Sequence, residues 1–106
     1  MATSKQYLEF VLDLLSLLED ISYRAMMGEY IVYYQGKIIG GVYDDRFLVK
    51  PTQSAKRMMP DAPYESPYAG AKEMLLVERI EDKAFLRELV SAMAAEFARP
   101  EEKEMI

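Results

Sequence analysis

The middle of the chain most constrains the fold. It contains three short runs rich in β-branched and aromatic residues, at 30–34, 37–43 and 46–50. Turn-forming pairs at 35–36 and 44–45 separate these runs. Runs of this composition between tight turns are typical of strands that pair with their sequence neighbours. The sequence therefore predicts a three-stranded antiparallel meander.

The segment before the meander, residues 4–20, is predicted to form a helix. Thr3 and Gln6 are expected to form a capping box at its start. Polar residues occupy only a narrow stripe, so the apolar arc is wider than the roughly 100° that packing on one sheet face requires. Either the helix is sandwiched between the sheet and a second helix, or part of it meets another subunit. The residues expected on the surplus apolar face are Leu8, Leu12 and Leu15.

Residues 51–72 interrupt the regular pattern and contain four of the five prolines. A short helix is predicted at 53–59. An extended loop is predicted at 60–70, because each proline removes a backbone donor and restricts the residue before it.

The last part of the chain returns to regular structure. Residues 73–78 indicate a fourth strand, and Asp82 is expected to cap a second long helix with apolar residues at three- and four-residue steps. Residues 100–106 are interpreted as a frayed acidic tail, which leaves one domain at 1–99. The predicted fold class is α+β, with an antiparallel sheet (the meander plus a fourth strand) flanked by N-terminal and C-terminal helices.

Composition limits the possible functions. A chain of 106 residues fits one domain. It contains no histidine and no cysteine, which removes disulfides, thiolate nucleophiles, most structural zinc sites and the usual neutral-pH proton shuttle. No pair of acids singles out acid–base chemistry by carboxylates alone. We therefore expect no enzymatic activity, no cofactor and no metal.

The N-terminal region gives an expectation about location. No apolar leader precedes a cleavage site, and Glu9 and Asp13 interrupt the apolar residues at 7–18, which argues against a membrane span. A cytoplasmic location is the default expectation. The net charge of −5 also argues against the whole surface serving as a nucleic-acid platform.

One local charge cluster stands out within this acidic chain. Residues 46–59 contain four cations and no acid, and Met58 and Met59 could add adaptable apolar contacts. One interpretation is an anion- or partner-binding patch. The other is a solvated strand end followed by a solvated helix face. The four cations are Arg46, Lys50, Lys56 and Arg57.

Three other groups of residues receive structural interpretations. Asp44 and Asp45 are interpreted as turn formers, because a metal site would need more converging oxygen ligands. The tyrosines of the middle region are interpreted as half-buried on a sheet face, since a base-stacking platform needs interleaved basic groups and only Lys37 is present. Arg24 and Glu29 are a possible ion pair leading into the first strand.

Several short motifs follow one another in a fixed order. They are Arg24-x-Met26-x-Gly28-Glu29-Tyr30, Tyr34-x-Gly36-Lys37-x-x-Gly40, Asp44-Asp45-Arg46, Lys50-x-Thr52 and Ala62-Pro63-Tyr64-x-x-Pro67-Tyr68-x-Gly70-Ala71-Lys72. Together they resemble the TfoX/Sxy N-terminal domain family, over roughly residues 5–97. The resemblance implies an α+β domain with an antiparallel sheet flanked by helices.

The same resemblance implies a bacterial regulatory association. Some members of the family are positive regulators of natural competence that act with the cyclic-AMP receptor protein. Those regulators usually carry a second, C-terminal domain, whereas this sequence ends after its second long helix, so we expect a single-domain member. The family brings no established catalytic residues.

Some motif residues are assigned to the fold rather than to a site. The glycines are expected at turns or close approaches, and the glycine pair at 40–41 predicts a bulge or close contact with another backbone, such as that of the first helix. The residues assigned to the fold are Arg24, Gly28, Glu29, Gly36 and Gly40.

The resulting functional expectation is a small cytoplasmic protein-interaction module with a regulatory role of the TfoX type. Its expected partners are proteins, including the transcription machinery, and a homodimer is expected through the first helix. One alternative is direct DNA binding through the basic patch at 46–57. Another is a small-molecule-binding or enzymatic domain with a pocket near residues 58–68, which requires an enclosed apolar pocket with converging polar groups.

Overall fold

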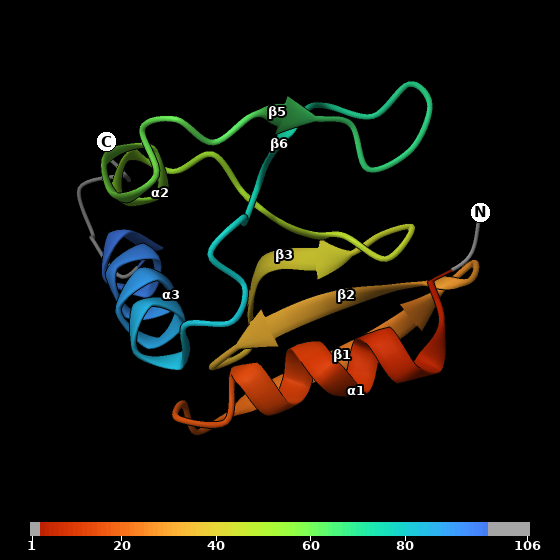
Figure 1. Cartoon of the computed structure of the whole chain (residues 1–106), viewed down its shortest axis with the longest axis horizontal. Helices are drawn as coiled ribbons and strands as arrows, with labels where there is room; N and C mark the ends of the chain where they lie inside the picture. The colour runs from red at the N-terminus through yellow and green to blue at the C-terminus, as the bar shows by residue number, and fades with distance from the viewer. Residues whose placement is uncertain (1–2, 98–106) are drawn as a thin grey trace.

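The computed structural model describes residues 3–97 and shows an α+β fold built on one antiparallel sheet (Figure 1). The order of strands across the sheet is β1-β2-β3-β4-β6-β5. The predicted acidic tail at 100–106 lies outside the described residues. The helices are α1 (Lys5–Leu14), α2 (Gln53–Met58) and α3 (Lys83–Phe97). The strands are β1 (Ile21–Met26), β2 (Glu29–Tyr34), β3 (Lys37–Val42), β4 (Phe47–Val49), β5 (Tyr64–Glu65) and β6 (Met74–Leu76).

The predicted meander is confirmed as β2, β3 and β4, and the predicted fourth strand is β6. The sheet is larger than expected, because β1 and β5 complete it at its two edges. β1 pairs with β2 without a register shift over six residue pairs, from Ile21 opposite Tyr34 to Met26 opposite Glu29. β1 was not predicted, because the expected sheet began at residue 30 and residues 21–26 were assigned to no element.

The first helix ends at Leu14, where a tight turn begins. The N–H of Leu18 donates to the carbonyl of Leu15 at 3.0 Å, and Asp20 adopts a left-handed backbone with φ of 66°. This turn reverses the chain, so that residues 21–26 run back along the sheet under the helix (Figure 1). The unbroken leucine pattern through this turn does not distinguish a helix from a buried turn.

The predicted capping box at the start of the first helix is also wrong. Ser4 is the N-cap, and its hydroxyl accepts a hydrogen bond from the N–H of Tyr7 at 3.1 Å. Thr3 is instead buried, with its side chain turned toward β2 and β3. A hydroxyl can either cap a helix or form a hydrogen bond in the interior. Here the Thr3 hydroxyl forms the interior contact, and the hydroxyl of Ser4 caps the helix.

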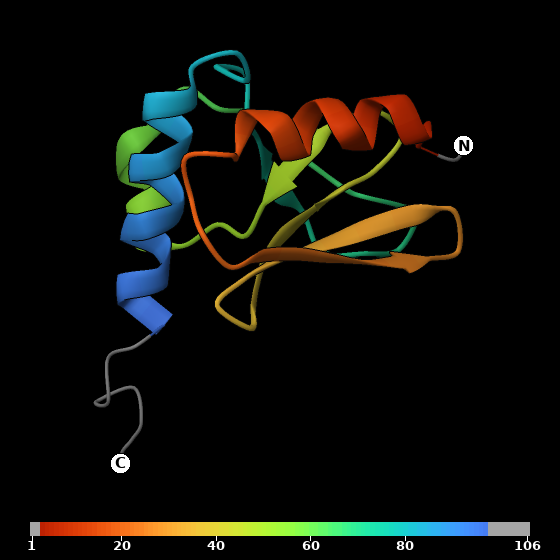
Figure 2. The same cartoon turned by 90° about the horizontal axis from the view of Figure 1, so that it is seen from below.

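The core lies between the sheet and the helices. α1 runs along one face of the sheet, while α3 stands beside it and packs against α2 (Figure 2). The Nζ of Lys83 at the start of α3 lies 3.6 Å from a carboxylate oxygen of Asp13 on α1. Leu8, Val11 and Leu14 of α1 are buried, so the sheet and α3 cover most of its wide apolar arc.

The glycine pair in β3 allows a close approach of β4, not of the first helix as expected. The β2–β3 register shifts between Val32 and Tyr33, which leaves one extra residue in β3 at this point. A Cβ atom on Gly40 would overlap the carbonyl oxygen of Leu48 and lie 2.8 Å from the Cα of Val49. The predicted bulge is therefore confirmed, and the neighbouring backbone belongs to the sheet.

Candidate functional site

The described part of the chain offers no ready-made chemical centre. Among residues 3–97 no group of three or more acidic residues could hold a metal ion together, and the chain has neither histidine nor cysteine. None of the helices within the same residues is long and apolar enough to cross a bilayer. The candidate sites are therefore surfaces and depressions.

Glu29 is the centre of the best-connected polar cluster. Its Oε1 accepts hydrogen bonds from the Thr3 N–H at 3.1 Å, the Thr3 hydroxyl at 2.6 Å and the Asp44 N–H at 3.0 Å. Asp45 adds a second link, because its carboxylate accepts a hydrogen bond from the Ser4 N–H at 3.0 Å. The cluster joins the chain before α1, the start of β2 and the β3–β4 turn.

Glu29 therefore does not form the ion pair with Arg24 that the sequence suggested. Arg24 is exposed on β1 and lies opposite Ile31, whereas Glu29 faces the N-terminal segment. The predicted pairing is wrong because β1 and β2 form a hairpin in which Glu29 is opposite Met26. Asp44 and Asp45 occupy a turn, as predicted, with φ of 52° and 56°.

Gly28 and Gly36 lie in the two tight hairpin turns. Met27 and Gly28 have φ of 53° and 86°, and Gln35 and Gly36 have φ of 53° and 80°. Two consecutive residues with positive φ are the geometry of a type I′ hairpin turn, which favours glycine. These glycines therefore contribute to the fold.

The four cations of the predicted basic patch do not stay together, because Arg46 and Lys50 contact different neighbouring groups. Arg46 Nη1 lies 2.6 Å from Glu65 Oε1, and Arg46 Nη2 donates to the carbonyls of Ser66 and Pro67 at 3.3 and 3.4 Å. Arg46 therefore ties the β3–β4 turn to β5. Lys50 is exposed, with its Nζ 5.5 Å from the centre of the Phe97 ring.

Lys56 and Arg57 remain together on the exposed last turn of α2. The start of the same helix is held by Glu96, whose carboxylate accepts hydrogen bonds from the N–H groups of Gln53 and Ser54. Burial raises the pKa of Glu96, but the hydrogen bonds from Ser54 and Gln53 and the charge of Arg57 outweigh it and lower the pKa overall. Part of the Arg57 charge is thus balanced by Glu96.

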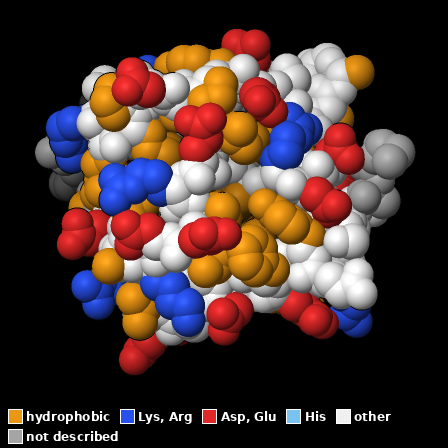
Figure 3. Space-filling view, in the orientation of Figure 1, with side chains coloured by type: hydrophobic (Ala, Val, Ile, Leu, Met, Phe, Trp, Pro, Cys, Tyr) orange, Lys and Arg blue, Asp and Glu red, His pale blue; other side chains and the backbone are white. Residues whose placement is uncertain are grey.

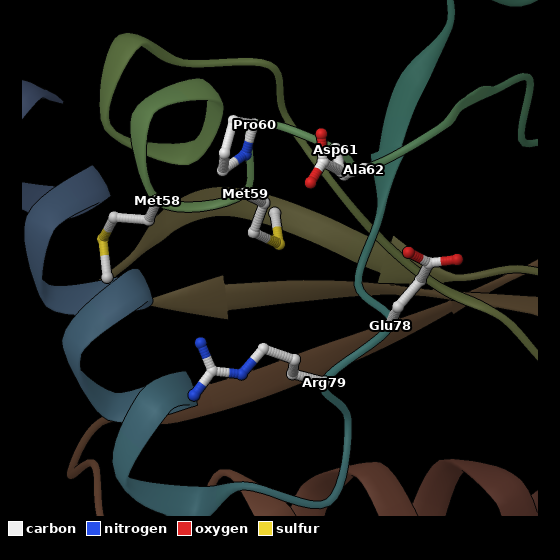
Figure 4. Close-up of a pocket in the computed structure, with 7 residues that line it drawn as sticks. All are labelled: Met58, Met59, Pro60, Asp61, Ala62, Glu78 and Arg79. Atoms are coloured by element: carbon white, nitrogen blue, oxygen red, sulfur yellow. The ribbon is translucent and has the colours of Figure 1, made fainter.

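A depression of about 220 Å³ lies directly after these two cations (Figure 4). Met58 is half-buried in its wall and Met59 is buried beneath it. Arg79 lines the opposite side, where its guanidinium stacks 4.1 Å from the Phe85 ring and contacts the Asp82 carboxylate at 3.0 Å. The remaining lining residues are Pro60, Asp61, Ala62 and Glu78. The site can accept an apolar side chain between groups of both charge signs.

A second hollow of about 430 Å³ has a more apolar lining. Tyr43 is almost buried and Tyr68 is half-exposed, with ring centres 6.3 Å apart. Burial, together with the neighbouring Tyr68, Glu29 and Tyr33, raises the pKa of the Tyr43 hydroxyl. The other residues around this hollow are Lys50, Pro51, Thr52, Pro67, Ala71, Lys72, Glu73 and Met74. Two sequence motifs that are distant in the chain, at 50–52 and 67–72, meet here.

The apolar residues predicted on the surface of the first helix are mostly inside. Leu8 and Leu15 are 1% exposed and belong to the core, so the prediction that they form an interaction surface is wrong. Leu12 is half-buried and lines a groove of about 510 Å³ between α1 and β1. This groove was not expected from the sequence, because the strand β1 that forms one of its sides was not predicted. The alternation of Ile21 and Tyr23 with polar residues, followed by the turn at 27–28, was the signal that could have identified it.

Fold and surface together define a small α+β protein whose candidate sites are two depressions and one groove around an antiparallel sheet. An uncharacterized 12.7 kDa protein in the trpE 5′ region of Spirochaeta aurantia is 30% identical over 101 residues, which cover 94% of this chain and 88% of that protein. The chain belongs to the same family as that protein. No family model matches the chain. No solved structure matches it either.

Proposed function

We propose that this protein is a small, cytoplasmic, non-enzymatic interaction module that contacts a protein partner at the end of α2. The observation that carries the proposal is the depression beside Met58, which opens directly after Lys56 and Arg57 (Figure 4). Methionine adapts its shape to different apolar partners. An apolar anchor surrounded by polar groups is the usual anatomy of a protein interface.

The partner expected at this surface follows from the residues that surround it. Lys56 and Arg57 favour an acidic neighbour, while Met58 and Pro60 favour an inserted apolar side chain. Asp61 and Glu78 stand on the far side of the depression and would repel an acidic group placed there. The proposed ligand is therefore a protein segment with an apolar anchor and acidic residues on one flank.

We further propose a regulatory role of the TfoX type, with a protein of the transcription machinery as the partner. The support is the resemblance of the ordered motifs, together with an α+β fold of the kind that the resemblance implies. The motif glycines at 28 and 36 lie in hairpin turns, and Gly40 lies against β4. A role for these residues in the fold is compatible with a family that has no catalytic residues.

Affinity capture from the lysate of the host, followed by mass spectrometry, tests both proposals. We expect a transcription factor or polymerase subunit to be recovered with the unmodified protein and to be lost with the Lys56→Glu/Arg57→Glu variant. The control is Lys37→Glu/Arg87→Glu, which makes the same change of charge at exposed positions on β3 and α3. Equal recovery with both variants would contradict the proposed surface.

A separate measurement distinguishes direct DNA binding from protein binding at this surface. The engagement of Arg46 with Glu65 leaves fewer free cations than the sequence suggested. The face shown in Figure 3 also intersperses acidic and basic side chains. Binding of a DNA duplex that weakens steeply with salt and disappears in Lys56→Glu/Arg57→Glu would favour DNA as the ligand instead. No binding at low salt is the expected result.

The hollow around Tyr43 and Tyr68 supports a second candidate function, binding of a small molecule. Aromatic and proline walls with lysines at the rim suit a planar anionic ligand. Titration with benzoate, followed by amide chemical shifts, tests this directly. We expect shifts confined to the residues of the hollow, and their loss in Tyr68→Ala but not in Tyr64→Ala, whose ring is similarly exposed (55% and 50%). Shifts spread over the surface would contradict a defined site.

A further inference from the structure

β1 is a six-residue edge strand with its outer side open within the described part of the chain. It pairs with β2 alone among the strands at residues 3–97. Natural proteins normally protect such an edge with charged side chains, lysine above all, or with proline, a bulge or a covering segment. β1 has one charged residue, Arg24, but no lysine and no proline, and its ladder with β2 has no bulge. The edge therefore keeps its capacity to pair with another strand.

The alternation of hydrogen-bonded pairs along the β1–β2 ladder shows which backbone groups of β1 face away from the sheet. The N–H of Gln35 donates to the carbonyl of Asp20 at 3.0 Å, so these two residues form a hydrogen-bonded pair. Because hydrogen-bonded pairs alternate along an antiparallel ladder, residues 22, 24 and 26 direct their N–H and C=O groups toward β2. Residues 21, 23 and 25 direct theirs away from the sheet. Three donors and three acceptors are thus presented along the outer edge.

Apolar side chains accompany this row of backbone groups. Tyr23 is 47% exposed, and its ring packs edge-on against Tyr30 with centres 5.8 Å apart. It stands at the mouth of the groove between α1 and β1 that Leu12 and Ile21 also line. The two ends of the same edge carry Met27, which is 96% exposed, and Leu17, which is 48% exposed. These are three of the most exposed large apolar side chains of the described residues.

We propose that β1 pairs with β1 of a second copy, which joins the two sheets into one across a two-fold axis at Tyr23. An axis at this residue places residue 21 of one copy opposite residue 25 of the other, and residue 23 opposite residue 23. Every outward-facing group of the strand then finds a partner. An axis shifted to residue 22 or 24 would leave one outward residue of each copy unpaired, so Tyr23 is the register that satisfies the edge most fully.

The same register explains the exposed apolar side chains. The two Tyr23 rings lie side by side at the mouths of the two grooves. Met27 of one copy reaches the level of residue 19 of the other, at the turn that carries its exposed Leu17. A second copy of the chain is favoured over an unrelated peptide because the two exposed ends of the edge complement each other only under this two-fold relation. The inference does not depend on the proposed function, which uses the opposite part of the molecule around α2.

The first test is the mass of the purified full-length protein in solution, measured by sedimentation equilibrium in the micromolar range. We expect a concentration-dependent dimer, and we expect Tyr23→Lys to weaken it at least about tenfold. The matched control is Tyr64→Lys, which makes the same change at a residue of similar exposure on β5, the other edge of the sheet. A monomer at all concentrations, or dissociation by Tyr64→Lys in place of Tyr23→Lys, would overturn the proposal.

The second test reports the register and does not depend on the stability of the Tyr23 variant. The proposed axis places residue 22 opposite residue 24 as a non-hydrogen-bonded pair, with Cα atoms about 4.5 Å apart, which suits a disulfide. The chain has no cysteine of its own. An equimolar mixture of Ser22→Cys and Arg24→Cys proteins should therefore form disulfide-linked dimers on mild oxidation, well above the yield of either variant alone. Equal yields from the single variants would exclude this register.

Discussion

The hydroxyl of Thr3 donates a hydrogen bond of 2.6 Å to Oε1 of Glu29, across 26 positions of the sequence. The same hydroxyl also lies 3.2 Å from the carbonyl oxygen of Val42 and 3.2 Å from the N–H of Asp45. Two side chains thus connect the segment before α1 with the start of β2 and the β3–β4 turn. This contact fixes the position of α1 on the sheet at its N-terminal end.

The role of Glu29 predicts a loss of stability on its removal. Glu29→Ala removes the shared acceptor of three hydrogen bonds. The Thr3 N–H and hydroxyl keep the carbonyls of Gly28 and Val42, at 3.0 and 3.2 Å, as acceptors, whereas the Asp44 N–H loses its acceptor. We expect the free energy of unfolding to fall by about 1–2 kcal/mol, because hydrogen bonds to a charged group are lost and one donor is left without its protein partner. Urea unfolding followed by circular dichroism measures this change. Glu9→Ala, an exposed change on α1, should stay within about 0.5 kcal/mol. Equal effects of the two variants would contradict the proposed role.

The two kinds of glycine in the sheet predict two different costs. Gly40→Ala would force a methyl group against the Leu48 carbonyl, so β3 and β4 must separate. Gly36→Ala meets no atom within 4 Å and is strained only by its φ of +80°. We expect losses of about 3 kcal/mol at Gly40 and about 1 kcal/mol at Gly36. Thermal and urea unfolding of both variants measure the difference. A milder effect at Gly40 than at Gly36 would show that the sheet relaxes around the added methyl.

Arg46 predicts a local change in dynamics rather than in overall stability. Its guanidinium contacts Glu65 and the carbonyls of Ser66 and Pro67, which holds the loop after β5 against the β3–β4 turn. Lysine cannot reproduce this fork of donors. Arg46→Lys should therefore speed amide hydrogen exchange around residues 64–72 by about tenfold or more, with little effect on β2. Arg87→Lys, at an exposed position on α3, is the control. Unchanged exchange in the loop would show that its proline-rich backbone holds it without Arg46.

The sequence predicted the elements whose signals are local. The meander has turn residues at each reversal, and α3 begins after Asp82, whose carboxylate accepts a hydrogen bond from the N–H of Phe85 at 3.0 Å as expected of a cap. β1 was missed because residues 21–26 were assigned to no element, and the leucines at 14–18 continue a helical pattern through a turn that only tertiary packing defines. β5 contains two residues and exists because Tyr64 pairs with Leu75 on β6.

The candidate sites were less predictable than the fold. The cations at 46–57 were identified correctly as residues, but their pairing depends on contacts with Glu65, Phe97 and Glu96, which are distant in sequence. The pocket expected near residues 58–68 is divided in the structure, because Met58 and Tyr68 line two separate hollows. Charge and residue type are visible in a sequence, whereas the partner of each side chain is set by the three-dimensional packing.

Glu96 predicts how stability depends on pH. Its carboxylate receives the first N–H groups of α2, and its folded-state pKa is lowered. A lowered pKa means that the carboxylate stabilises the fold above the ordinary glutamate value of about 4.3. This contribution is lost as the pH falls through the folded-state pKa. We expect Glu96→Gln to cost about 1 kcal/mol at pH 7, with the difference from the unmodified protein shrinking toward zero in strong acid.

Urea unfolding of the two proteins at a series of pH values between neutral and strongly acidic measures this difference. Glu88→Gln serves as the control. Glu88 is exposed on the same helix, and its substitution removes the same charge from the chain. Its unfolding free energy should follow that of the unmodified protein at every pH. If Glu96→Gln instead lost the same stability at every pH, the carboxylate would act only through its shape. The charge interaction with the start of α2 would then be excluded as the cause of its effect.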